Sequence, residues 1–143
     1  MFKKLTNKQV RDHWEDLKHA IIADFPTHPK NVNLWLNSIL EGILKGDLGY
    51  WVGLDENRNI VLACLTSFIQ DPCTFEKSLM ISSVYGYLQI PEEVWLDGIK
   101  SILLYAQDSG CAAVVAYSEN KEVIELGQKT NANVATTYIQ WRL

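Results

Sequence analysis

"PEEVWLDGIKSILLYAQDSGC", residues 91–111, decides the fold of this chain. Apolar residues recur in it at helical spacing, Pro91 suits the first turn of a helix, and Gly110 suits a left-handed cap after the last turn. The pattern therefore predicts one helix over 92–109. Its buried stripe is expected to consist of Trp95, Ile99, Ile102, Leu103 and Ala106.

Strand patterns stand on both sides of this helix. SLMISSVYGYL (78–88) precedes it and CAAVVAYS (111–118) follows it. Antiparallel neighbours can be joined by a short turn, whereas parallel neighbours need a crossover connection, which is usually a helix. Such crossovers are right-handed in nearly all proteins. We therefore expect the strands near 79–88 and 111–118 to be parallel neighbours.

Two helices are predicted before the first strand. The first begins at a capping box formed by Thr6 and Gln9 and runs to about Asp24. Asn31 can cap the second, and Gly46 ends it. Both segments carry apolar residues at helical spacing.

A hairpin follows these helices, formed by LGYWVGL (48–54), the turn DENRN and IVLACLTSFI (60–69). The second of these strands is apolar on both faces, so helices are expected on both sides of the sheet. Towards the carboxyl end, Asn120 can cap a short helix, KEVIELGQK, and NVATTYIQWRL (133–143) predicts a last strand.

The predicted fold class is α/β with a mixed sheet in one domain, residues 1–143. The sheet should be antiparallel on its N-terminal side and parallel around the crossover helix.

Composition narrows the class of protein. A net charge of −4 and a pI near 5.3 argue against a nucleic-acid partner, because phosphate binding needs clustered Lys and Arg. The three cysteines are widely spaced and the three histidines have no ligand spacing, so neither a disulfide framework nor a metal site is expected. No apolar run is long enough to span a bilayer, which favours a soluble cytoplasmic protein without a membrane partner.

The carboxyl-terminal third carries a family pattern. AQDSGCAAVVAYSENKEVIELGQKTNANV (106–134) resembles the GNAT superfamily of acyl-coenzyme-A-dependent N-acetyltransferases, whose pattern is A…GC, a strand and N-x-x-A-x-x-L-Y-x-K-x-G-F. Successive positions of that pattern are matched by Asn120, Val123, Leu126, Lys129 and Asn131. Asn131 stands where the family has Gly, and Asn also accepts a left-handed backbone. The resemblance implies a GNAT-like fold over nearly the whole chain.

The family's cofactor loop, Q/R-x-x-G-x-G/A, is altered in this sequence. Alignment on Gln89 puts Glu92 at the first glycine and Val94 at the second, and Pro91 removes one N–H donor. Acidic residues there stabilise the helix through its dipole but repel a pyrophosphate. The resemblance therefore implies a degenerate coenzyme A site, and no cofactor is expected.

The family's general acid, a tyrosine, would fall at Gly127, which has no proton to give. Close packing is the expected reason for a glycine there, and no catalytic residue is assigned. Tyr85, Tyr87 and Asn120 are candidates for lining a surviving cleft where the family's sheet opens. The competing interpretation is that both tyrosines pack against helices with their hydroxyl groups at the rim.

The leading functional hypothesis is a noncatalytic GNAT-like domain that acts through protein contacts. WVGLDENRNIV (51–61) and LLYAQDSGC (103–111) are similar in pattern to small GNAT-like proteins of tailed bacteriophages, which implies a virion-associated or accessory role with phage structural proteins or a second copy as partner. Ile139 and Trp141, on one face of the predicted last strand, are the expected contact surface.

Two alternatives stay open. The first is a divergent acyl-coenzyme-A-dependent N-acetyltransferase, which would bind acetyl-coenzyme A. The second is a module that binds another small ligand in the vacated cleft.

Overall fold

The computed structural model describes residues 1–25, 28–118, 120–134 and 139–143. In chain order its helices and strands are β1 (Phe2–Lys4), α1 (Asn7–Asp24), α2 (Val32–Lys45), β2 (Leu48–Leu54), β3 (Ile60–Gln70), β4 (Lys77–Gly86), α3 (Glu92–Asp108), β5 (Ala113–Ala116) and α4 (Lys121–Lys129).

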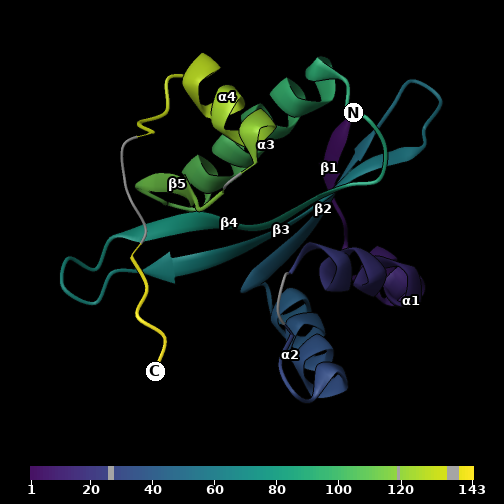
Figure 1. Cartoon of the computed structure of the whole chain (residues 1–143), viewed down its shortest axis with the longest axis horizontal. Coiled ribbons are helices and arrows are strands. Elements are labelled where there is room, and N and C mark those ends of the chain that lie inside the picture. Colours follow the sequence, from purple (N-terminus) through teal and green to yellow (C-terminus); the bar gives the residue numbers. More distant parts are fainter. Residues whose placement is uncertain (26–27, 119, 135–138) are drawn as a thin grey trace.

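The five strands form one mixed sheet in the order β1-β2-β3-β4-β5, antiparallel from β1 to β4 and parallel between β4 and β5. Helices α1 and α2 lie on one face of the sheet, and α3 and α4 lie on the other (Figure 1). The predicted mixed α/β fold with helices on both faces is confirmed.

The parallel pair that decides the fold is also confirmed. Its register runs from Ser78 opposite Ala113 to Ile81 opposite Ala116, and α3 makes the crossover between the two strands. Gly110 has a φ of 77° and follows the helix as expected. β5 is shorter than the predicted strand 111–118.

The first two helices begin and end where their sequences predict. Both hydrogen bonds of the Thr6–Gln9 capping box are present. The Asn31 side chain accepts a hydrogen bond from the Leu34 amide, and Gly46 ends α2 with a φ of 88°.

β3 contributes to two hydrophobic cores, as its two apolar faces predict. Ala63 and Leu65 pack with α1 and α2, whereas Leu62 and Cys64 pack with α3. The central strand therefore binds both helical layers to the sheet.

The buried face of α3 differs from the predicted stripe. Its buried residues are Val94, Gly98, Ile102 and Ala106. Trp95 and Ile99 are only half-buried, and Leu103 is 46% exposed. Ile102 and Ala106 are buried as predicted. The other positions were misplaced because Gly98 has no side chain to mark the buried face, although a Cβ there would lie 3.3 Å from the Phe2 ring.

Three further details correct the sequence predictions. Pro91 is the N-cap of α3 and not a residue of its first turn. Strand β1 was not predicted, because its three residues are too few to show an alternating pattern. Residues 133, 134 and 139–143 of the predicted last strand lie in no strand, and 135–138 fall outside the described residues.

Candidate functional site

The parallel ladder between β4 and β5 ends before β4 does. The last pair is Ile81 with Ala116, whereas β4 continues to Gly86. Within the described residues, the segment 82–86, named here the open segment of β4, has a strand neighbour on only one side. Ligands of open α/β sheets bind outside the carboxyl ends of the strands where neighbouring strands part, so this edge is the candidate site.

A bulge in β4 marks where the ladder ends. Leu65 pairs with Ser83 and Thr66 pairs with Ile81, so Ser82 is an extra residue between the two pairs. Its Oγ lies 2.9 Å from Oγ of Ser67. Bulges bend a strand and end its pairing, as this one does beside β5.

Helix α3 begins next to this edge without a side-chain cap. Its N-cap is Pro91, whose carbonyl accepts hydrogen bonds from the amides of Val94 and Trp95 at 3.0 and 3.3 Å. In the part of the chain that the structure describes, the amides of Glu92 and Glu93 have no acceptor. Unpaired amides at a helix N-terminus attract anions.

Glu92 is paired with a residue of α4. A carboxylate oxygen of Glu92 accepts a hydrogen bond from Nζ of Lys129 at 2.9 Å. That hydrogen bond, together with the opposite charge, lowers the pKa of Glu92 and raises the pKa of Lys129. The carboxylate at the first altered glycine position is therefore partly neutralised, which weakens the repulsion that the sequence predicts for a pyrophosphate.

Val94 and Gln89 do not face a common site. Val94 is only 2% exposed, and its Cγ1 would lie 2.8 Å from a Cβ added at Gly53 of β2. It is thus a core residue of α3. Gln89 is exposed in the connection between β4 and α3.

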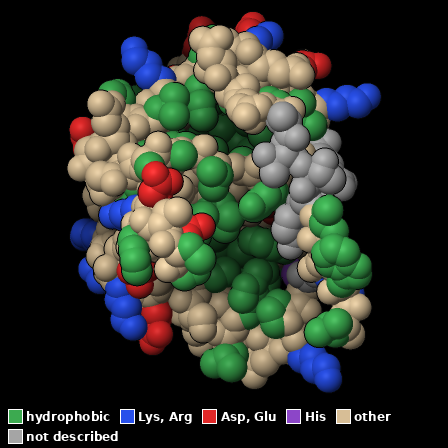
Figure 2. All heavy atoms as spheres, turned by 90° about the vertical axis from the view of Figure 1, so that its left-hand side faces the viewer, with side chains coloured by type: hydrophobic (Ala, Val, Ile, Leu, Met, Phe, Trp, Pro, Cys, Tyr) green, Lys and Arg blue, Asp and Glu red, His purple; other side chains and the backbone are tan. Residues whose placement is uncertain are grey.

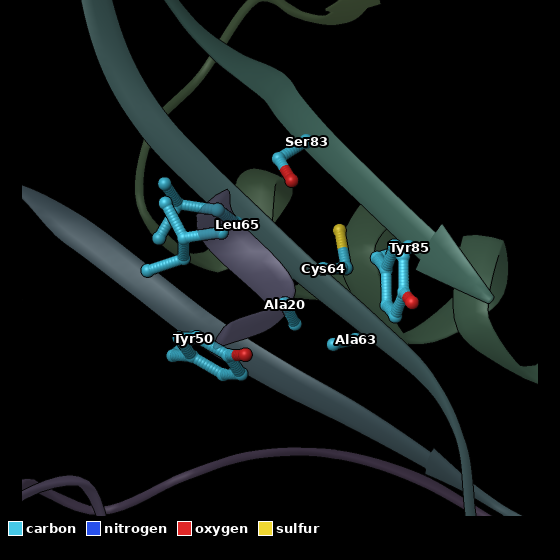
Figure 3. Close-up of a pocket in the computed structure, with 8 residues that line it drawn as sticks. Ala20, Tyr50, Ala63, Cys64, Leu65, Ser83 and Tyr85 are labelled. Atoms are coloured by element: carbon cyan, nitrogen blue, oxygen red, sulfur yellow. The ribbon is translucent and has the colours of Figure 1, made fainter. Parts of the chain in front are cut away.

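The two candidate cleft tyrosines lie together. The rings of Tyr85 and Tyr87 are perpendicular, with their centroids 5.0 Å apart. Tyr85 packs against the α1–α2 core and lines, with Ala20 and Ser83, a pocket too tight to hold a water molecule (Figure 3). Tyr87 is 42% exposed, and burial raises its pKa, as do the charges of Tyr85 and Asp16. Tyr85 fits the packing interpretation, whereas Tyr87 presents a ring to solvent.

Asn120 and Asn131 serve the backbone of α4. The Asn120 side chain caps the helix by accepting a hydrogen bond from the Glu122 amide at 2.9 Å. Asn131 has a φ of 65°, the left-handed conformation expected where the family has Gly. Among the described residues, a Cβ at Gly127 would meet Val134 and Ala132 at ordinary contact distances of 3.4 and 3.6 Å, so their packing does not require this glycine.

The three cysteines differ in burial. Cys64 is buried, and desolvation with the charge of Asp24 raises its pKa to about 12. Cys73 is exposed and Cys111 is half-buried. Among the described residues, no group of His, Cys, Asp and Glu side chains could hold a metal ion.

Hydrophobic side chains are exposed far from the open segment of β4. Figure 2 shows a hollow lined mainly by hydrophobic side chains on the side that carries the β3–β4 hairpin. Ile139 and Trp141 are 65% and 81% exposed, but they lie in no strand, so their predicted shared face stays a prediction. No helix in the described part of the chain has the length and apolarity needed to cross a membrane.

The contact between Glu92 and Lys129 was not predicted from the sequence. Both residues were identified, one in the altered loop and one in the family pattern. They are 37 positions apart, and no local spacing signals a pair at that separation.

Comparisons with known proteins bear on the fold. No protein-family model and no curated protein matches the sequence. Solved structures do match over the whole chain. A predicted acetyltransferase from Clostridium acetobutylicum, solved with acetyl-CoA, has a TM-score of 0.73 at 13% identity and covers 99% of this chain and 95% of its own.

Two further structures agree. An aminoglycoside N-acetyltransferase in complex with CoA has a TM-score of 0.70 at 16% identity, covering 100% of this chain and 93% of its own. A ribosomal-protein-alanine N-acetyltransferase from Brucella melitensis biovar Abortus 2308 has a TM-score of 0.67 at 12% identity, covering 100% and 99%. This chain therefore has the fold of the GNAT acetyltransferases.

Proposed function

We propose that this protein is a divergent acyl-coenzyme-A-dependent N-acetyltransferase whose donor binds at the open segment of β4. The observation that carries this proposal is the early end of the parallel ladder at Ile81 and Ala116, which leaves residues 82–86 of β4 without a second strand neighbour in the described part of the chain. An edge where parallel strands part at their carboxyl ends is a preferred ligand position. The likeness of the fold to structures solved with acetyl-CoA and CoA supports a ligand of this class.

The residues at the start of α3 fit an anionic group in part. The amides of Glu92 and Glu93 point out of an uncapped helix N-terminus, and Lys129 brings a cation to the same place. These groups would hold the pyrophosphate, and Lys129 would exchange its carboxylate partner for a phosphate. When bound, acyl-coenzyme A supplies an activated thioester carbonyl. Pro91 has no backbone N–H and would donate no hydrogen bond to the pyrophosphate.

A noncatalytic role is the second candidate, and two observations favour it. Lys129, the cation at the start of α3, already has an anionic partner in Glu92. Gly127, at the position of the family's tyrosine, cannot donate a proton. The comparisons link the chain to acetyltransferases and not to phage proteins, so this candidate is a protein-contact domain without an assigned source.

Calorimetric titration with acetyl-coenzyme A separates the two candidates. The first candidate predicts saturable binding, and a ligand at one hundred times its Kd adds about 2.7 kcal/mol to the free energy of unfolding. Lys129→Ala should weaken binding about tenfold, as expected for a lost charge-assisted hydrogen bond of about 1.5 kcal/mol. Lys121→Ala, at the other end of α4, is the matched control and should bind like the parent.

No heat and no melting shift at millimolar acetyl-coenzyme A would favour the noncatalytic role. Binding that Lys129→Ala and Lys121→Ala reduce equally would place the donor elsewhere.

A further inference from the structure

We propose that the side of the molecule that carries the β3–β4 hairpin binds a second copy of this chain, with Phe75 of each copy entering the apolar hollow of the other. The proposal does not rest on the proposed function. Three features support it: an aromatic side chain held at the end of the hairpin, an apolar hollow on the same side, and opposite charges next to the exposed aromatic residues.

The hairpin projects from the sheet. Residues 69–76, named here the hairpin tip, lie beyond the last pairs with the neighbouring strands, which are Leu48 with Ser67 and Ser78 with Ala113. Figure 1 shows the tip reaching past these strands. The hairpin tip is therefore placed to contact another molecule.

Phe75 is held at the hairpin tip with its ring in solvent. The residue is 72% exposed and has a φ of 60°, a conformation that is disfavoured for a bulky side chain. Its amide donates a hydrogen bond to the carbonyl of Asp71 at 2.8 Å, and Nε2 of Gln70 donates one to its carbonyl at 3.0 Å. Glycine or asparagine would fit this backbone with less strain. The turn thus presents a large apolar ring in a fixed position, which lowers the entropy that binding costs.

A surface that can receive this ring lies on the same side of the molecule. The hairpin and the C-terminal residues 139–143 are on one side (Figure 1), and Figure 2 shows the apolar hollow there. Ile139 and Trp141 add side chains that are 65% and 81% exposed. A side that carries both a projecting ring and a hollow is complementary to itself. Two copies related by a two-fold axis can therefore each fill the hollow of the other.

Opposite charges stand next to the two exposed aromatic residues. Glu76 follows Phe75, and Arg142 follows Trp141. Both charged side chains are exposed, and neither has an ion-pair partner among the described residues. In a two-fold contact, Glu76 of each copy would meet Arg142 of the other. Two such pairs would fix the register and offset the repulsion between chains of net charge −4.

Sedimentation velocity of the whole chain, from micromolar to millimolar concentration, tests the proposal. We expect the mass to rise from one copy to two and no further, because a two-fold contact closes on itself. Phe75→Asn removes the ring but suits the left-handed turn, and should raise the dissociation constant about thirtyfold or more, as for a central apolar anchor. Leu34→Ala, which removes an exposed apolar side chain from α2, is the control and should dimerise like the parent.

Charge reversal tests the register. Glu76→Lys and Arg142→Glu each put like charges at both contacts, so each variant alone should dimerise about tenfold more weakly than the parent. In an equimolar mixture, a dimer with one copy of each variant has opposite charges at both contacts. The mixture should therefore recover most of the parent's association. Glu41→Lys, at an exposed carboxylate of α2, is the matched control and should dimerise like the parent.

Four results would each overturn the proposal: a parent that stays monomeric at every concentration, growth beyond two copies, a Phe75→Asn dimer as stable as the parent dimer, or a mixture that associates no better than its two components. Circular dichroism reports whether each variant is folded. Because Phe75, Glu76 and Arg142 are all exposed, these substitutions leave the buried core intact.

Discussion

Nζ of Lys129 lies 2.9 Å from a carboxylate oxygen of Glu92, and this contact joins the last residue of α4 to the first residue of α3. The apolar residues of α4 are at most half-buried, so packing holds this helix weakly in the described part of the chain. The pair stands where the resemblance places the cofactor's pyrophosphate. It therefore connects the position of α4 with the capacity of α3 to take an anion.

The ion pair predicts a pH dependence of stability. Its hydrogen bond lowers the pKa of Glu92 below the ordinary value of 4.5, so the folded state holds this proton less tightly than the unfolded state. The contribution is present above pH 4.5 and is lost as the pH falls through the lowered folded value. Glu92→Gln should remove that part of the acid-induced fall in melting temperature.

The effect should be small and should fade in salt, because both side chains are more than half exposed. Glu93→Gln, which changes the neighbouring carboxylate, is the control and should keep the parent's pH profile. A parent and a Glu92→Gln variant with the same profile at low salt would show that the pair is not formed in solution.

Gly127→Ala should stabilise the protein by about 0.5–1 kcal/mol, because alanine is preferred to glycine within a helix. Within the part of the chain that the structure describes, an added Cβ would meet ordinary contacts at 3.4 and 3.6 Å. Chemical denaturation measures the free energy of unfolding, and Gly110→Ala is the contrast, since its φ of 77° penalises any Cβ. A destabilised Gly127→Ala would restore the close-packing explanation.

The crossover helix and the strands beside it could be predicted because their signals are local. Capping residues such as Thr6 and Asn31, and the left-handed Gly110, act on their own backbone, so sequence alone locates the ends. The whole buried face of α3 could not be predicted, because Gly98 is buried by Phe2 of a strand too short to recognise. The contact between Glu92 and Lys129 could not be predicted either, because 37 positions separate the two residues.

The roles of Tyr85 and Tyr87 could be predicted only in part. Their sequence left two interpretations open, lining a cleft or packing against helices. Tyr85 packs against the α1–α2 core, whereas Tyr87 is 42% exposed. The difference depends on how α1 packs on β4, a tertiary relationship that no local pattern encodes.

The exposed side chain of Trp141 predicts that the protein associates with itself or with a protein partner. A tryptophan 81% exposed near Ile139, itself 65% exposed, leaves apolar surface that association would remove from water. We expect concentration-dependent light scattering from the parent that Trp141→Ala weakens. Leu34→Ala, which removes an exposed apolar side chain from α2, is the control. A parent that stays monomeric at every concentration would contradict the prediction.

Gly53 and Val94 test whether the second altered glycine position belongs to the core. A Cβ at Gly53 would lie 2.8 Å from Cγ1 of Val94 and 3.1 Å from Cβ of Leu62. Gly53→Ala should therefore destabilise the fold by about 1–3 kcal/mol, the usual cost of overpacking. Val94→Ala alone should also destabilise, because it leaves a cavity against β2. In the double variant the new methyl group enters the space that Val94 vacates, so the two losses should be less than additive. Additive losses in denaturant unfolding would mean that Val94 does not press on Gly53 and would contradict its assignment to the core.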